Sequence, residues 1–213
     1  MKEFLNTDKI TFKIAKVLSK IPISADAWTW LAMIPAVIGF YFIAFLPHTA
    51  IHTGAGVLLF LVSGFMDGID GGIARIRGKP TKLGAFMDGT LDRFVDFLVF
   101  YSFVFLALPA FILSVEHWVM LMIFFGIMPS FICAYANHRG AVDDPNEKVV
   151  WRILHRAEMI GLLLIALAVS TSSPLISMYI LTGVVILSIV TTAQSFGLAI
   201  YKSRKLGEKK TPL

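Results

Sequence analysis

Five aspartates lie within or at the ends of two adjacent apolar stretches of the sequence: Asp67, Asp70, Asp88, Asp92 and Asp96. A carboxylate in the middle of a membrane-spanning helix costs about 2.5–3.5 kcal/mol on insertion scales. Five uncompensated carboxylates would cost on the order of 12–18 kcal/mol, which is comparable to the stability of a whole domain. Two arginines lie close by in the sequence, at Arg75 and Arg93. Because two cations cannot balance five anions, bound divalent metal ions are the simplest further compensation.

The spacing of the aspartates supports a metal site. Asp67 and Asp70 are three residues apart, and Asp88 and Asp92 are four apart. On an α-helix either spacing places both side chains on one face, with Cβ atoms about 5–6 Å apart. Two such helices facing each other would bring four carboxylates into one pocket, and oxygen ligands of this kind suit Mg²⁺, Mn²⁺ or Ca²⁺. Asp96, four residues after Asp92, either supports this site or faces a neighbouring helix.

Small residues surround the first pair of aspartates, at Gly68, Gly71, Gly72 and Ala74. Glycine inside a helix costs up to about 1 kcal/mol relative to alanine, so the set needs a reason. Close helix packing is one reason. Close approach of a bulky ligand to the backbone is the other, and the neighbouring carboxylates favour it. Arg75 ends the stretch, where its guanidinium suits an anionic diphosphate. The cations that follow, Arg77, Lys79 and Lys82, are equally well explained as ordinary membrane anchors.

The elements that must position these residues are predicted to span a membrane. Of the 213 residues, 57% are hydrophobic and 15% are charged, whereas a soluble domain carries about 25% charged residues. A helix needs about 20 apolar residues to cross a bilayer. Six stretches approach or exceed this length: Trp28–Leu46, Gly54–Gly72, Gly84–Leu108, Trp118–Ala136, Met159–Val169 extending toward Ser173, and Leu175–Ile200. We therefore expect an all-α integral membrane protein with six transmembrane helices in one domain, residues 28–201.

The basic residues predict the orientation of these helices. Of the 19 Lys and Arg residues, five precede Trp28 and five follow Ile200, while the segments 47–53, 109–117 and 170–174 contain none. Because Lys and Arg concentrate in cytoplasmic loops, both termini and the aspartate motif are expected on the cytoplasmic side of the cell membrane. The charge also favours contact with anionic membrane lipids. Nucleic-acid binding is not expected, since no basic soluble face is evident.

Two terminal segments flank the predicted helical domain. In the N-terminal segment, residues 1–27, apolar and lysine side chains alternate at helical spacing between Asp8 and Ile21. This pattern is typical of an amphipathic helix lying in the membrane interface, although a cap helix that packs on a partner has the same pattern. Residues 202–213 form a basic tail that we expect in the cytoplasm. The single cysteine, Cys133, excludes an intrachain disulfide.

The whole motif resembles the signature of a known enzyme family. It reads Asp67-x-x-Asp70-Gly71-x-x-Ala74-Arg75, then eight residues, then Gly84-x-x-x-Asp88-x-x-x-Asp92. All eight fixed positions match those of the CDP-alcohol phosphotransferase family (CDP-alcohol phosphatidyltransferase class I). The resemblance implies that an acceptor alcohol attacks the β-phosphorus of a CDP-linked lipid donor and releases CMP. It also implies a homodimer.

The resemblance further implies a role for each motif residue. Asp67, Asp70 and Asp88 would bind two Mg²⁺ or Mn²⁺ ions, and Asp92 would complete the site and act as general base. Gly71, Ala74 and Gly84 would make room for the cytidine, and Arg75 would contact the donor phosphate, so that these residues and the first two aspartates bind CDP. The spacing alone does not decide whether Asp92 is a base or only a ligand.

A second cluster bears on the acceptor. Tyr135-x-x-x-Arg139, followed by Arg156-Ala157-Glu158, resembles the branch that makes phosphatidylinositol phosphate or its archaeal counterpart, archaetidylinositol phosphate. The resemblance implies that Tyr135, Arg139 and Arg156 bind the acceptor, inositol phosphate. Asn137 stands where the branch tends to have lysine, and Met159 where it tends to have a second arginine. Neutral acceptors such as serine, glycerol or inositol, or a water-soluble CDP-alcohol donor, are the alternatives, with the two arginines then serving as membrane anchors.

Two other classes of membrane protein use intramembrane acids. Membrane prenyltransferases hold Mg²⁺-diphosphate with two aspartate-rich motifs in separate halves of a longer bundle. Cation or proton transporters tend to carry an internal repeat or acids in both halves. In this chain the aspartates lie in the second and third apolar stretches, and the last three stretches have no acidic residue in the middle. The distribution therefore favours the phosphotransferase.

Overall fold

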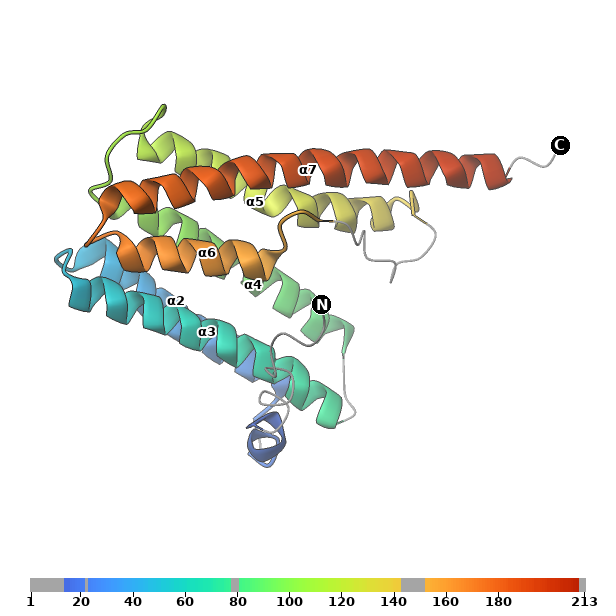
Figure 1. Ribbon diagram of the computed structural model, residues 1–213. Coiled ribbons are helices and arrows are strands. Elements are labelled where there is room, and N and C mark those ends of the chain that lie inside the picture. Colours follow the sequence, from blue (N-terminus) through green and yellow to red (C-terminus); the bar gives the residue numbers. More distant parts are fainter. Residues whose placement is uncertain (1–13, 22, 78–80, 143–151, 211–213) are drawn as a thin grey trace. The chain divides into compact units, whose positions relative to one another are not determined.

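The computed structural model describes residues 14–21, 23–77, 81–142 and 152–210, apart from the side chains of 25–26, 70–71, 74–75 and 207–210. Its elements are α2 (Ala25–Phe45), α3 (Ala50–Ile76), α4 (Lys82–Ser102), the short 3₁₀ helix η1 (Phe103–Phe105), α5 (Val115–His138), α6 (Arg156–Val169) and α7 (Pro174–Lys210) (Figure 1). Within the described ranges the structure contains helices and no strand longer than an isolated bridge. The helices form two compact units, unit 1 up to Leu106 and unit 2 from Ala107.

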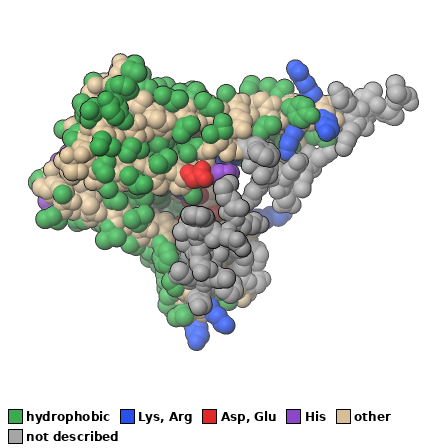
Figure 2. Space-filling model, viewed as in Figure 1, with side chains coloured by type: hydrophobic (Ala, Val, Ile, Leu, Met, Phe, Trp, Pro, Cys, Tyr) green, Lys and Arg blue, Asp and Glu red, His purple; other side chains and the backbone are tan. Residues whose placement is uncertain are grey.

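The expectation of an all-helical membrane protein is confirmed. Four helices contain segments long and apolar enough to cross a bilayer, at residues 27–45 in α2, 50–69 in α3, 115–138 in α5 and 174–206 in α7. Figure 2 shows hydrophobic side chains over most of the visible described surface, with Lys and Arg side chains near the far end of α7 and on the segment before α2. A bilayer would cover such an apolar surface.

The other two predicted spans, α4 and α6, are helical but differ from the four apolar helices. Helix α4 has 21 residues and carries the charges of Asp88, Asp92, Arg93 and Asp96, while α6 has only 14 residues. The number of six spans therefore stays a prediction. The predicted third stretch, Gly84–Leu108, is also interrupted, because α4 tightens into η1 after Ser102 and the chain is extended at Leu106.

Local capping explains two other helix boundaries. Helix α6 starts at Arg156, before the predicted Met159, because Glu158 accepts a hydrogen bond from the His155 backbone N–H at 3.1 Å in a reciprocal capping box. Helix α5 ends where Gly140 takes φ = +64°. There the N–H of Ala141 donates to the Ala136 carbonyl at 2.9 Å, as in a Schellman motif. At the other end of the chain, α7 continues beyond Ile200 to Lys210, so the described part of the basic tail is helical.

In unit 1, helix α2 packs against both α3 and α4. Its crossing with α3 depends on two glycines. A Cβ atom at Gly39 would lie 2.8 Å from the Gly56 carbonyl oxygen, and a Cβ atom at Gly56 would lie 2.6 Å from Ile43 Cγ1. Such distances are too short for carbon atoms, so only glycine allows the two backbones to come this close.

In unit 2, helix α7 packs against both α5 and α6. Pro129 lies inside α5 and cannot donate the backbone hydrogen bond that the Phe125 carbonyl would normally accept. Thr192 of α7 compensates, since its hydroxyl lies 3.2 Å from the Phe125 carbonyl oxygen and 2.8 Å from that of Ser188. The interruption in α5 is therefore stabilised by a side chain from the neighbouring helix.

The segment before α2 packs on the end of α3. Residues 14–18 are helical, and Ala15 is fully buried against Ile69 and Ile73. Val17, one of the apolar residues between Asp8 and Ile21 that formed the predicted amphipathic pattern, is 65% exposed. Residues 8–13 of the predicted amphipathic helix lie outside the described residues, so the interfacial helix as a whole stays a prediction.

Candidate active site

Helix α4 presents the second half of the aspartate motif. Thr81 caps its first turn by accepting a hydrogen bond from the Gly84 N–H at 2.9 Å. From this start, Asp88, Asp92 and Asp96 follow at intervals of four residues and therefore share one helix face. Asp88 and Asp92 are partly buried, whereas Asp96 is completely buried.

Helix α3 carries the first half of the motif in its last three turns. Asp67 is partly buried. The backbone of Asp70, Gly71, Ala74 and Arg75 is helical, but their side chains, and with them the predicted metal and CDP contacts of these residues, lie outside the described part. Helices α3 and α4 are not among the closely packed helix pairs of unit 1. Among the described side chains no three acidic, histidine or cysteine residues gather closely enough to hold a metal ion. Because that set does not include Asp70, the four-carboxylate pocket stays a prediction.

One glycine of the small-residue set has a packing role. A Cβ atom at Gly72 would lie 2.9 Å from the Ala15 Cβ atom. Close packing against the segment before α2 therefore explains this glycine, and the ligand interpretation of the other small residues stays a prediction.

An ion-pair chain connects the acids of α4. Arg93 approaches Asp96, with 3.1 Å between Nη1 and Oδ2, and also Asp92, with 3.7 Å between Nη2 and Oδ2. One guanidinium thus lies between two carboxylates of the same helix. The sequence left the role of Asp96 open between a supporting residue and a packing position. Its contact with Arg93 places it in the same charged network as Asp92.

Arg77 has a structural role that the sequence did not reveal. Its guanidinium donates hydrogen bonds to three backbone carbonyls of the segment before α2: those of Ser19 at 2.9 Å, Ile21 and Ile23. These carbonyls follow the end of the helical turn at residues 14–18, where acceptors lack partners within the helix. Arg77 therefore joins that segment to the end of α3, next to the motif, rather than serving only as a membrane anchor.

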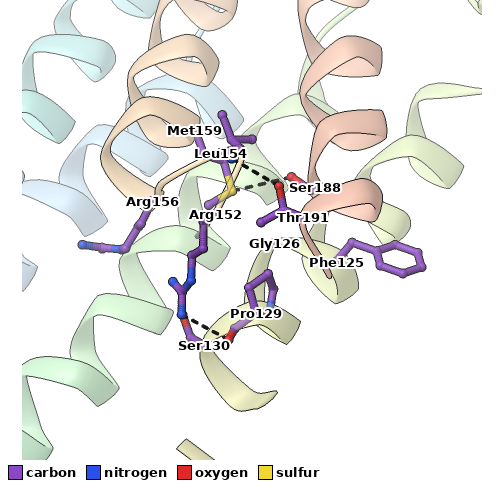
Figure 3. A pocket seen from close by; sticks show the side chains of 10 residues that line it. All are labelled: Phe125, Gly126, Pro129, Ser130, Arg152, Leu154, Arg156, Met159, Ser188 and Thr191. Atoms are coloured by element: carbon purple, nitrogen blue, oxygen red, sulfur yellow. Dashed lines mark hydrogen bonds between the residues drawn. The ribbon is translucent and has the colours of Figure 1, made fainter. Parts of the chain in front are cut away.

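Unit 2 contains a small pocket between α5, α6 and α7 (Figure 3). Its lining combines two arginines with polar and apolar side chains: Phe125, Gly126, Pro129, Ser130, Arg152, Leu154, Arg156, Met159, Ser188 and Thr191. Arg152 reaches along the pocket and donates to the Pro129 carbonyl at 3.1 Å, while Arg156 extends away from Ser188 and Thr191. The Ser188 hydroxyl lies 3.8 Å from the Met159 sulfur, so Met159 forms part of the wall.

The predicted acceptor residues separate into two groups. Arg156 lines the pocket with Arg152. Tyr135 and Arg139 do not line it but are exposed at the end of α5. The Arg139 Cζ atom lies 6.0 Å from the Tyr135 ring centre, and the Phe131 ring stacks on the Tyr135 ring with 5.6 Å between the ring centres. The sequence assigned no role to Arg152. Arg152 lies four residues before Arg156, a spacing that would place both on one face of a helix. Because α6 begins only at Arg156, this spacing could not have predicted that the two residues share a pocket.

Comparison with known proteins decides the family. Residues 23–194 match the CDP-alcohol phosphatidyltransferase family. The chain belongs to this family. The enzyme class that the aspartate signature implied is thereby confirmed, and the prenyltransferase and transporter alternatives lose their support.

Relatives of this family member carry names that agree with the second cluster. The chain is 48% identical over 44 residues to the archaetidylinositol phosphate synthase of Methanothermobacter thermautotrophicus, covering 21% of this chain and 23% of the relative. It is 36% identical over 92 residues to the phosphatidylinositol phosphate synthase of Mycobacterium tuberculosis H37Rv, covering 43% and 41%. The matched stretches thus span less than half of these relatives' length.

Solved structures show the same fold over most of the chain. The Mycobacterium tuberculosis phosphatidylinositol phosphate synthase with CDP-DAG bound gives a TM-score of 0.70 at 23% identity, covering 90% of this chain and 94% of that one. The same enzyme in complex with manganese and citrate gives 0.70 at 24% identity, covering 89% and 88%. At this level of identity the likeness establishes a shared fold.

Proposed function

We propose that this family member transfers a phosphatidyl-type group from a CDP-linked lipid to inositol phosphate and releases CMP. The observation that carries the proposal is the complete eight-position signature between Asp67 and Asp92, within a chain that matches the family over residues 23–194. The names of the relatives support the choice of acceptor.

The carboxylates of α3 and α4 fit divalent metal ions. Asp67, Asp70, Asp88 and Asp92 provide only oxygen donors, which Mg²⁺ and Mn²⁺ prefer. Asp88 and Asp92 share one face of α4 and are partly buried, as ligands to a bound ion would be. Two bound ions would neutralise the charge that develops on the donor diphosphate during transfer. The manganese complex of the mycobacterial enzyme supports this assignment.

The remaining motif residues serve the donor and the acceptor hydroxyl. Gly71, Ala74 and Gly84 leave space for the cytidine, and Arg75 contacts a donor phosphate. Asp92 takes the proton of the acceptor hydroxyl as it attacks the β-phosphorus, because a carboxylate within hydrogen-bond reach can act as general base.

The pocket of unit 2 supports a phosphorylated acceptor. Two arginines line it, and arginine binds phosphate through paired N–H donors better than other side chains do. Arg152 provides a second cation in a pocket where Met159 stands in place of the arginine found in the branch. We therefore propose Arg152 and Arg156 as the residues that bind the acceptor phosphate, and Tyr135 and Arg139 as further contacts of the acceptor.

We further propose the membrane arrangement that the sequence predicts. Six helices cross the cell membrane, the amphipathic N-terminal segment lies at the interface, and both termini and the active site face the cytoplasm. The chain acts as a homodimer. The four apolar helices and the distribution of Lys and Arg support this arrangement.

A CMP-release assay tests the proposal. Purified protein in detergent is incubated with Mg²⁺, CDP-diacylglycerol or CDP-archaeol, and one acceptor from a panel of inositol phosphate, glycerol phosphate, serine, glycerol and inositol. We expect CMP only with inositol phosphate, loss of CMP release with EDTA, and at least 100-fold slower release by Asp92→Asn, in the range about 10²–10⁴ typical of a lost general base.

Other outcomes would change the proposal in defined ways. Release of CMP with neutral acceptors alone would remove inositol phosphate but keep the family reaction. The reaction itself would be refuted if no combination released CMP and Asp92→Asn matched the wild type in binding and turnover.

A further inference from the structure

Asp96 is an acidic residue in the interior of a membrane protein, and its side chain is 0% exposed. Apart from Ser102, the other buried residues of α4 are apolar: Leu91, Val99 and Phe100. A buried carboxylate is unfavourable unless a cation and hydrogen-bond donors accompany it. Arg93, one turn earlier, provides both at 3.1 Å. A residue whose only task was packing would be better served by an apolar side chain, so the charge needs a further reason.

Arg93 links this buried charge to the proposed active site. Its second terminal nitrogen lies 3.7 Å from Asp92 Oδ2, and the side chains of Arg93 and Asp92 are 24% and 18% exposed. Because the guanidinium is planar and its donors are fixed in direction, holding one nitrogen at Asp96 determines where the other one points. Asp96 therefore controls the position of Arg93 relative to Asp92.

We infer that Asp96 and Arg93 are positioning residues that set the orientation of the Asp92 carboxylate for divalent metal binding. The inference rests on the proposed role of Asp92. The unequal distances carry it, because Arg93 is closer to Asp96 than to Asp92. The arginine thus restricts rotation of Asp92 through Oδ2 without forming a tight pair that would compete with the metal ion. Without Asp96, Arg93 would move onto Asp92 and oppose the ion. Partners of metal ligands commonly have such an orienting role.

Direct Mn²⁺ binding distinguishes this role from simple stabilisation of α4. Mn²⁺ alone is titrated into purified full-length protein in detergent, and free Mn²⁺ is measured by electron paramagnetic resonance. We expect Asp96→Asn to weaken binding about 10-fold. Asp96→Glu, which keeps the charge, should bind more tightly than Asp96→Asn. In an Arg93→Gln background the Asn substitution should weaken binding less than about 2-fold, because the effects of coupled residues are not additive.

Two further variants control for folding. Ser102→Ala removes a buried hydroxyl on the same helix, which donates to the Leu98 carbonyl at 2.7 Å, and should bind Mn²⁺ like the wild type. Arg93→Lys changes a partly exposed residue and tests the inference even if Asp96→Asn does not fold. Because lysine lacks the planar guanidinium, whose two terminal nitrogens point in fixed directions, this variant should also bind several-fold more weakly.

Three results would overturn the inference. The first is wild-type Mn²⁺ affinity in folded Asp96→Asn, and the second is wild-type Mn²⁺ affinity in Arg93→Lys. The third is an equal loss of Mn²⁺ affinity when Asp96→Asn is introduced into the wild type and into Arg93→Gln. If the wild-type protein itself binds no Mn²⁺, the proposed metal site fails and this inference fails with it.

Discussion

Two arginines give the pocket of unit 2 its chemistry. Arg152 donates to a neutral backbone carbonyl, that of Pro129, at 3.1 Å, and Arg156 lines the same pocket at the start of α6. A carbonyl does not neutralise a guanidinium, so an anion that enters this pocket meets positive charge. Tyr135 and Arg139, by contrast, form an exposed stack in which the ring already contacts the cation. Binding of the acceptor phosphate should therefore depend more on Arg152 and Arg156 than on Tyr135 and Arg139.

This difference gives a prediction at the scale of single residues. Arg152→Gln and Arg156→Gln should each raise the KM for inositol phosphate about 10-fold or more, since a hydrogen bond to a charged group contributes about 1.5–3 kcal/mol. The KM for CDP-diacylglycerol should stay within about 2-fold of the wild type.

Arg139→Gln is the matched control, and its effect on the KM for inositol phosphate should be the smallest of the three. Steady-state kinetics of CMP release measure all of these values. A larger effect at Arg139 than at Arg152 would show that the exposed stack, rather than the pocket, binds the acceptor.

At the scale of elements, helix contacts in unit 1 depend on the absence of side chains. Gly39 and Gly56 allow α2 and α3 to cross closely, and Gly72 allows Ala15 to pack on α3. Arg77 then holds the segment that contains Ala15 through backbone carbonyls. The end of α3, which carries half of the aspartate motif, is thus packed against the segment before α2.

The α2–α3 crossing predicts a position-dependent effect of a single methyl group. Gly56→Ala should destabilise the protein by about 1–3 kcal/mol, because the new carbon would lie 2.6 Å from Ile43 Cγ1 and 2.8 Å from the Gly39 carbonyl oxygen. Gly64→Ala on the same helix is the control, since nothing lies within 4 Å of the added atom. Thermal unfolding in detergent should show a Tm below that of the wild type for Gly56→Ala but not for Gly64→Ala. Equal Tm values would mean that the helices do not cross at Gly56.

The Arg77 contacts predict a local change rather than a global one. Arg77→Gln removes the donors to the carbonyls of Ser19, Ile21 and Ile23, so the segment at residues 14–21 should open more often. Hydrogen–deuterium exchange should become faster there, while exchange in α5 and α7 stays unchanged. Lys82→Gln removes an exposed cation at the start of α4 and should leave the exchange of residues 14–21 as in the wild type.

At the scale of the whole molecule, the distribution of charge predicts how the chain lies in the membrane. In a Cys133→Ser background, Tyr201→Cys should react with a membrane-impermeant maleimide only after the cells are opened. Ile112→Cys, in a segment without Lys or Arg and 82% exposed, should react in intact cells. The reverse pattern would place the aspartate motif outside the cell and contradict the proposed reaction with a cytoplasmic donor.

The sequence by itself predicted the family and the reaction class correctly and determined the positions of the helices. The reason is that these depend on local features: apolar length for the helices, and the spacing of aspartates and glycines for the motif. The six predicted stretches each contain a helix, and the errors lie at the ends, as at Ser102, Arg156 and Lys210.

Contacts between residues distant in sequence were decided only by the tertiary structure. No periodicity indicates that Gly72 faces Ala15, that Arg77 binds carbonyls more than fifty residues earlier, or that Arg152 shares a pocket with Arg156. The same holds for Asp96, whose spacing was compatible with two roles until its burial and its contact with Arg93 distinguished them. Burial and partner choice are properties of packed helices, and the pattern within one helix cannot supply them.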